Sequence, residues 1–98
     1  MSEVLKALAH PTRRAILRLL REREMSAGEI AGHFDLSKPT LSGHFNELRD
    51  AGLVEVQRQG TSLIYRLNAS VLEEALMELM DGFGLSARRP GPDKEPSQ

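Results

Sequence analysis

Two short helix signals separated by a turn restrict the fold more than any other feature of the chain. Ser26 is followed three residues later by Glu29, the S-x-x-E pattern that caps the start of a helix. Ser37 precedes a second start, since Pro39 is tolerated in a first turn, where the backbone N–H groups have no partner within the helix. The pattern predicts a short helix, a turn and a longer helix at 38–51.

A hairpin signal follows this helix directly, after a stop that the chain marks with Gly52. Apolar alternation begins at Val54, and a polar turn, "RQGT", contains Gly60. The second strand carries its apolar residues on one face: Leu63, Tyr65 and Leu67. Two helices joined by a short turn and followed at once by a hairpin are the layout of a winged helix-turn-helix.

Helices also flank this unit on both sides. A short helix at 3–9 is separated from a core helix at 12–23 because Pro11 disfavours helical dihedrals at His10. Four arginines of the second helix lie away from its apolar positions, which predicts a solvated face: Arg13, Arg14, Arg18 and Arg21. The last helix is expected to be capped by Ser70 and to end near Phe83.

The chain is therefore expected to be mainly α with a small β-hairpin, in the order α-α-α-α-β-β-α. Residues 1–84 form the predicted winged helix-turn-helix domain, which both binds DNA and dimerises. Residues 85–98 contain three prolines and almost no apolar residues, so we expect a disordered C-terminal tail.

Composition narrows the class of protein. The 98 residues include no Cys, which removes disulfides, thiolate metal sites and a cysteine nucleophile. The net charge of −1 divides unevenly, with 10 Lys/Arg against 8 Asp/Glu in residues 1–70 and 3 against 6 in residues 71–98. No apolar run approaches the roughly 20 residues that cross a bilayer. We expect a cytoplasmic protein without membrane insertion, cofactor or enzymatic activity.

The helix at 38–51 has one apolar face and one short, polar face. In a helix that lies in the major groove of DNA, N-terminal residues meet base edges, and basic or hydroxyl side chains hold phosphates. We therefore call it the reading helix. The predicted DNA contacts are on this helix and at the hairpin tip: Lys38, Pro39, Thr40, Ser42, Gly43, His44, Asn46, Arg49, Arg58, Gln59 and Thr61.

Two acidic residues beside this face leave an alternative open. Glu47 and Asp50 would repel phosphates, and the chain as a whole is nearly neutral. A winged-helix module that binds protein rather than DNA would tolerate both features. Removal of a basic residue such as Lys38 would then leave partner binding intact.

Three segments resemble the ArsR/SmtB-type winged-helix transcriptional repressors: "LKALAHPTRRAILRLL", "SAGEIAGHFDLSKPTLSGHFNELRDAGLV" and "GTSLIYRLN". The nearest branch is that of the SdpR-like autorepressors, which do not sense metal. The resemblance implies a homodimer that binds a palindromic operator in double-stranded DNA. Where many family members have two adjacent histidines, this chain has Gly43 and His44, followed by Phe45 where Leu is usual. This departure puts a base contact at position 43 in doubt.

The resemblance also implies that the first and last helices form the dimer interface, and both are rich in apolar residues. The predicted interface residues are Val4, Leu5, Leu8, Leu72, Leu76, Leu79, Met80 and Phe83. They are more apolar surface than a small monomer easily hides. An inducer of unknown kind, either a protein or a small molecule, is expected to relieve repression.

No metal site is predicted. The third-helix segment that holds thiolates in sensing relatives is "EIAGHFDL" here, with no Cys, and the last helix has no His. The three histidines His10, His33 and His44 lie on different elements without the spacing of a helical metal-binding pair. His10 is expected to be a helix-boundary residue and His44 a groove or core-flanking one.

Overall fold

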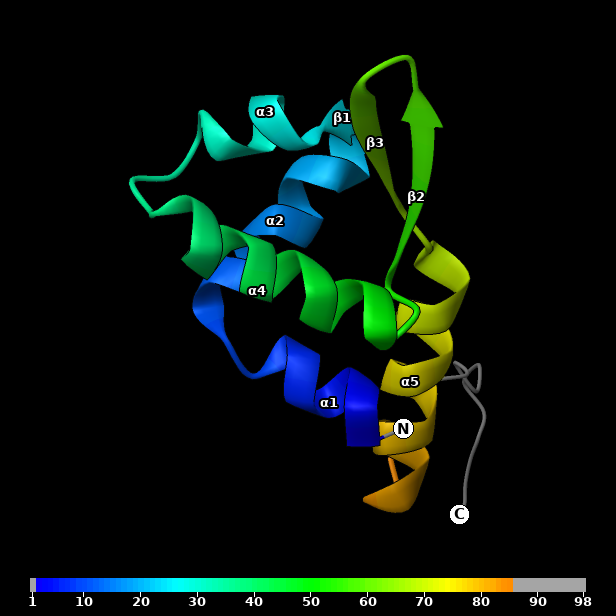
Figure 1. The fold of residues 1–98 in the computed structure, drawn as a ribbon. Coiled ribbons are helices and arrows are strands. Elements are labelled where there is room, and N and C mark those ends of the chain that lie inside the picture. The colour runs from blue at the N-terminus through cyan, green and yellow to red at the C-terminus, as the bar shows by residue number, and fades with distance from the viewer. Residues whose placement is uncertain (1, 86–98) are drawn as a thin grey trace.

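The computed structural model describes residues 2–85, which form five helices and three short strands (Figure 1). In chain order these are α1 (Ser2–Leu8), α2 (Pro11–Glu22), β1 (Met25–Ser26), α3 (Ala27–Ala31), α4 (Lys38–Asp50), β2 (Val54–Gln59), β3 (Ser62–Leu67) and α5 (Ala69–Gly82). The predicted fold class, mainly helical with a β-hairpin, is confirmed. Residues 86–98 lie outside the described part, and the tail prediction with them, apart from the exposed Leu85.

The sequence pattern does not predict the third strand, β1. Met25 pairs with Tyr65 and Ser26 pairs with Ile64, both antiparallel, so the sheet order is β1-β3-β2. The strand is only two residues long and ends at the cap of α3. It attaches the middle of β3 to the segment that leads into α3.

The caps at the start of α3 and α4 are those that the sequence predicts. The Glu29 N–H donates to Ser26 Oγ at 3.0 Å, and the Ser26 N–H donates to Glu29 Oε1 at 2.9 Å. That backbone hydrogen bond lowers the pKa of the Glu29 carboxyl. At α4, the Thr40 N–H donates to Ser37 Oγ at 3.3 Å, with Pro39 in the first turn. These caps determine the residue at which each helix begins.

The cap predicted at Ser70 is wrong. The N-cap of α5 is Asn68, whose side chain makes no capping hydrogen bond, and Ser70 already lies inside the helix. The Asn68 N–H instead donates to the carbonyl of Leu53 at 2.9 Å. The start of α5 is therefore held by the chain leaving α4 rather than by a local cap.

Arginines join α1 to α2, so the predicted solvated face of α2 is corrected in part: it also holds the end of α1. Arg13 Nε donates to the carbonyl of Ala7 at 2.9 Å, and Arg14 Nη1 donates to that of Leu8 at 2.8 Å. Both carbonyls end α1 and have no partner within that helix, so positive side chains suit them. Between the helices, His10 has an extended backbone and caps α2, as the boundary prediction requires.

One core holds the helices and the sheet together. Its largest fully buried side chains come from four different elements or turns: Ile16, Ile30, Leu48 and Leu53. The Phe45 ring stacks on that of Tyr65 at 4.6 Å between centroids, which ties α4 to β3. The position of α4 is therefore set by burial along its whole inner face.

Candidate nucleic-acid interface

Helix α4, the reading helix, presents an apolar face to the core and a polar face to solvent. Its buried residues are Leu41, His44, Phe45 and Leu48. All other predicted contacts on this helix are exposed: Lys38, Pro39, Thr40, Ser42, Gly43, Asn46 and Arg49. In Figure 1 the helix crosses the front of the molecule, with α3 above it and α1 below.

The N-terminus of α4 combines three features that suit a phosphate. Its first N–H groups have no partner within the helix, and the helix dipole makes this end positive. Lys38 adds a full charge in the first turn. Ser37 Oγ lies 2.9 Å from Thr40 Oγ1, so the capping serine also orients the threonine hydroxyl.

Further along the exposed face, two side chains support each other. Arg49 Nη2 donates to Asn46 Oδ1 at 3.0 Å. This bond leaves the Asn46 amide group as a donor and holds the guanidinium beside it. A pair of this kind can read a base edge with the amide while the arginine meets the backbone.

His44 is buried on the inner face of α4, so of its two expected roles the structure agrees with the core-flanking one and not with a DNA contact. Its side chain is only 8% exposed and lies on the inner face of α4. The ring centroid is 4.4 Å from that of His10. Burial lowers the pKa of His44, and the positive charges of His10 and Arg13 lower it further. The ring therefore faces the α1–α2 junction and cannot reach a groove.

The hairpin of β2 and β3 forms the wing. Gly60 has φ +63° at the start of its turn, a conformation that favours glycine. All three predicted wing residues, Arg58, Gln59 and Thr61, are exposed at this tip. In Figure 1 the tip lies well apart from the N-terminus of α4, so the structure does not gather the predicted contacts into one cluster.

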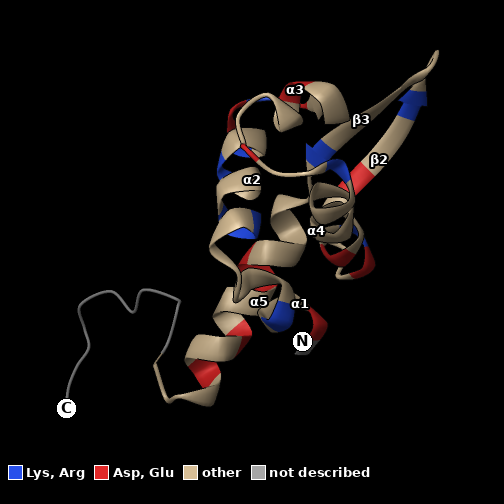
Figure 2. Cartoon of the chain, turned by 60° about the vertical axis from the view of Figure 1, so that its left-hand side comes forward, with Lys and Arg blue, Asp and Glu red and all other residues tan. Residues whose placement is uncertain are grey.

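Charge is distributed along the elements rather than concentrated in one patch (Figure 2). Helix α2 carries several arginines, whereas α5 carries only acidic charges. On α4, Glu47 is half-buried and Asp50 is exposed at the last position. The acids therefore lie at the C-terminal half of the reading helix, and the half that begins at Lys38 has none.

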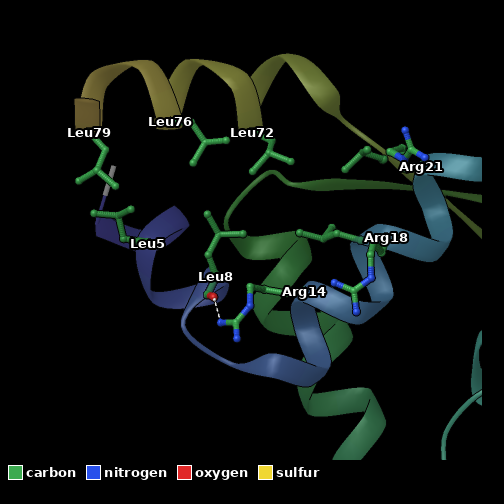
Figure 3. Close-up of a pocket in the computed structure, with 10 residues that line it drawn as sticks. Leu5, Leu8, Arg14, Arg18, Arg21, Leu72, Leu76 and Leu79 are labelled. Carbon is green, nitrogen blue, oxygen red and sulfur yellow. Dashed lines mark hydrogen bonds between the residues drawn. The ribbon is translucent and has the colours of Figure 1, made fainter. Parts of the chain in front are cut away.

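A second surface lies between α1, α2 and α5. It is a groove of about 460 Å³ with an apolar floor and arginines along one side (Figure 3). The lining residues are Leu5, Leu8, Leu17, Leu67, Leu72, Leu76, Leu79, Arg14, Arg18 and Arg21. Five of the predicted interface residues line it, while Met80 and Phe83 are exposed further along α5.

Val4 is the exception among the predicted interface residues. It is 7% exposed and belongs to the core of the monomer, so it has no surface to offer a partner. Sequence spacing does not separate it from its neighbour Leu5, which does line the groove. Conversely, the sequence analysis does not place Leu17 and Leu67 there, because they come from elements outside the first and last helices.

Comparison with known proteins agrees with this geometry. A family model described as a helix-turn-helix domain matches residues 8–57. The transcriptional repressor SdpR of Bacillus subtilis (strain 168) is 45% identical over 76 residues, which cover 78% of this chain and 84% of that protein. The chain belongs to the ArsR/SmtB-type family of helix-turn-helix repressors.

Other members of the family extend the likeness to sequence and structure. The arsenical resistance operon repressor of Staphylococcus xylosus is 40% identical over 74% of this chain and 70% of its own length. An ArsR-like transcriptional regulator from Rhodococcus sp. RHA1 superposes with a TM-score of 0.73 at 29% identity, over 85% of this chain and 77% of that one. The chain is accordingly a DNA-binding transcriptional repressor and not an enzyme.

Two further findings concern the described residues alone. None of the helices between residues 2 and 85 is long and apolar enough to span a membrane. Within the same part of the chain, no group of three His, Cys, Asp or Glu side chains is placed to hold a metal ion.

Gly43, where many family members have a histidine, is open to a direct test. A Cβ built on this residue meets nothing within 4 Å, so Gly43→Ala is expected to raise the free energy of unfolding by about 1 kcal/mol through helix propensity. If the backbone at Gly43 approaches DNA closely, the added methyl lowers operator affinity several-fold. Chemical denaturation and fluorescence anisotropy measure the two effects. Gly82→Ala on α5, equally open, is the control and should leave DNA affinity unchanged.

Proposed function

We propose that this repressor binds a palindromic operator as a homodimer, regulates its own promoter and does not respond to metal. The observation that carries the proposal is the division of α4 into a locked inner face and an exposed polar one. Leu41, Phe45 and Leu48 hold the helix in place while Ser42 and Asn46 face outward. A rigidly supported polar helix is what direct reading of base edges requires.

The homodimer is supported by apolar surface that one chain leaves exposed. Phe83 is 72% exposed, Leu76 is 44% exposed and Met80 is 38% exposed, all at or near the C-terminal half of α5. A two-fold axis that passes beside this helix would bury the same patch on both protomers. To bind successive major grooves on one side of DNA, the two reading helices of the dimer must then lie about 34–36 Å apart. A palindrome is the operator that matches this symmetry.

Independence from metal is supported by the residues available as ligands. The chain has no Cys, and α5 has no His to accompany its acids. The arsenical resistance in the names of some relatives is therefore not carried over to this chain. Autoregulation is supported by the likeness to the SdpR-like autorepressors.

Binding to the DNA immediately upstream of the protein's own coding sequence tests the proposal. A gel shift should show selective retention of this fragment over a scrambled duplex of equal length. Footprinting should then protect two half-sites about one helical turn apart. Affinity should fall steeply with salt, since each neutralised phosphate adds about 0.9 to the negative log–log slope. Equal retention of both duplexes would contradict the proposal.

A further inference from the structure

His44 is a polar residue on the buried face of the reading helix, and one of its ring nitrogens lacks, in the described part of the chain, a hydrogen-bond partner that would offset the cost of burial. Its side chain is 8% exposed, and within the described residues no hydrogen-bond partner reaches its Nδ1 atom. The ring lies against that of His10, with centroids 4.4 Å apart and planes tilted by 56°. An imidazole therefore occupies a position where Leu41 and Phe45 suggest an apolar side chain.

His10 has a structural role of its own beside this ring. The Thr12 N–H donates to His10 Nδ1 at 3.1 Å, and this bond caps α2. The contact between the two rings therefore joins the N-terminus of α2 to the middle of α4.

The other charges around the pair do not offset a proton. Arg13 on α2 is held beside it by the carbonyl of Ala7, and its charge repels a charged His44. Helices α1 and α2 and strand β2 all pack against α4, yet no carboxylate from their described residues stabilises the ring. Glu47, one turn along α4, forms no ion pair with it in the described structure. A proton on His44 would thus place a second positive charge beside that of Arg13, with no carboxylate from residues 2–85 to offset it.

We propose that the contact of His44 with His10 positions the reading helix on the α1–α2 junction only while the His44 imidazole is neutral, so that mild acid loosens α4 and weakens operator binding. His44 acts here as a positioning residue, through the helix that carries the exposed contacts. The inference rests on the proposed operator-reading role of α4, and it adds a pH dependence to that role.

The direction of the effect follows from the folded environment. Burial, then His10 and Arg13, lower the pKa of His44 below its usual value of 6.5. A looser state in which water reaches the ring has a pKa near that value, so it binds a proton more readily. The positioning effect is therefore fully present above about pH 6.5 and disappears as pH falls through the lowered folded pKa.

The opposite direction is expected of an ordinary DNA-binding histidine. A proton gained near phosphates adds positive charge and strengthens binding. Acid weakening and acid strengthening therefore separate a positioning role from a direct contact.

Fluorescence anisotropy on the operator duplex, at constant ionic strength, tests the proposal between about pH 7.5 and about pH 5.5, the range in which histidine changes charge. The wild-type protein should lose affinity several-fold on acidification, because the loosened state takes up the proton on His44 more readily than the packed state does. His44→Gln keeps a polar side chain without the titration and should bind at neutral pH but lose little in acid. His33→Gln is the matched control, because His33 is exposed outside the pair, and it should keep the wild-type slope.

Two outcomes would overturn the proposal. One is wild-type affinity that stays constant or rises in acid, and the other is a His44→Gln variant with the wild-type slope. If His44→Gln does not fold, His44→Leu decides instead, because leucine suits the buried apolar face of α4 and does not titrate. That variant should likewise flatten the profile.

The free protein separates this inference from the proposed function. Hydrogen-exchange protection of the α4 amides, corrected for intrinsic rates, should fall in acid for the wild type and hold for His44→Gln. Failure to find any selective duplex would remove the proposed function but leave this readout intact. Protection that is the same at both pH values would reject the pair as a positioning device.

Discussion

Leu76→Glu is expected to convert the proposed homodimer into a folded monomer that no longer binds its operator selectively. Leu76 is 44% exposed in the single chain and lines the groove beside Leu8 and Leu72, so the monomer core does not depend on it. In a two-fold interface the introduced carboxylate is buried twice. Burying an unpaired charge costs several kcal/mol for each copy, so the dimer dissociation constant should rise more than a hundredfold.

Operator binding should fall with dimerisation, since a monomer engages one half-site and forgoes the roughly 10²- to 10⁴-fold gain of linked binding. Sedimentation equilibrium and a gel shift measure the two effects, and circular dichroism checks the fold. Met77→Glu is the matched control, because Met77 is 42% exposed on the neighbouring position but does not line the groove. A Leu76→Glu protein that remains dimeric would place the interface elsewhere.

The parts of the fold that could be predicted are those encoded by neighbours in sequence. A serine and a glutamate three residues apart determine where α3 begins, and Ser37 with Pro39 determines where α4 begins. Gly60 at φ +63° marks the wing turn in the same local way. Each feature depends on backbone geometry within one turn, so it can be predicted without the tertiary fold.

The parts that could not be predicted depend on contacts between distant residues. Strand β1 exists only because Met25 finds Tyr65 across the sheet, and two residues show no periodicity. Arg13 looks like any exposed arginine until the end of α1 is placed beside it. Ser70 has the right spacing for a cap, but the turn after β3 starts the helix earlier.

In the candidate site, too, some features follow from local sequence spacing and others depend on tertiary contacts. The exposed face of α4 follows from helical period, and so does the burial of His44, which is three residues after Leu41 and four before Leu48. The polarity of imidazole favours the exposed face of α4. The spacing of His44 from Leu41 and Leu48 is the signal that could have placed it on the buried face. Val4 and Leu5 are adjacent, and only the packing of α1 against α5 decides which of them enters the core.

Asn46→Ala is expected to weaken operator binding by roughly 2–6 kcal/mol, because each base-edge contact is worth about 1–3 kcal/mol and a dimer makes two. Binding to unrelated DNA should change little, since phosphates dominate that affinity. Asn46 is exposed and bonded only to Arg49 among its described contacts, so the fold should be unaffected. Ser42→Ala should act in the same direction. Competition assays with operator and random duplexes measure both affinities.

Arg58→Ala, compared with Asn46→Ala, tests whether the wing and α4 bind DNA in different ways. A wing arginine that meets phosphate or the minor groove contributes to operator and random DNA alike, so both affinities should fall together. The salt slope should also decrease by about 0.9 for each phosphate that the variant no longer neutralises. Ser70→Ala, an exposed polar-to-alanine change on α5, should alter neither affinity. Equal losses of affinity for Asn46→Ala and Arg58→Ala on both duplexes would mean that α4 holds the backbone rather than reads the bases.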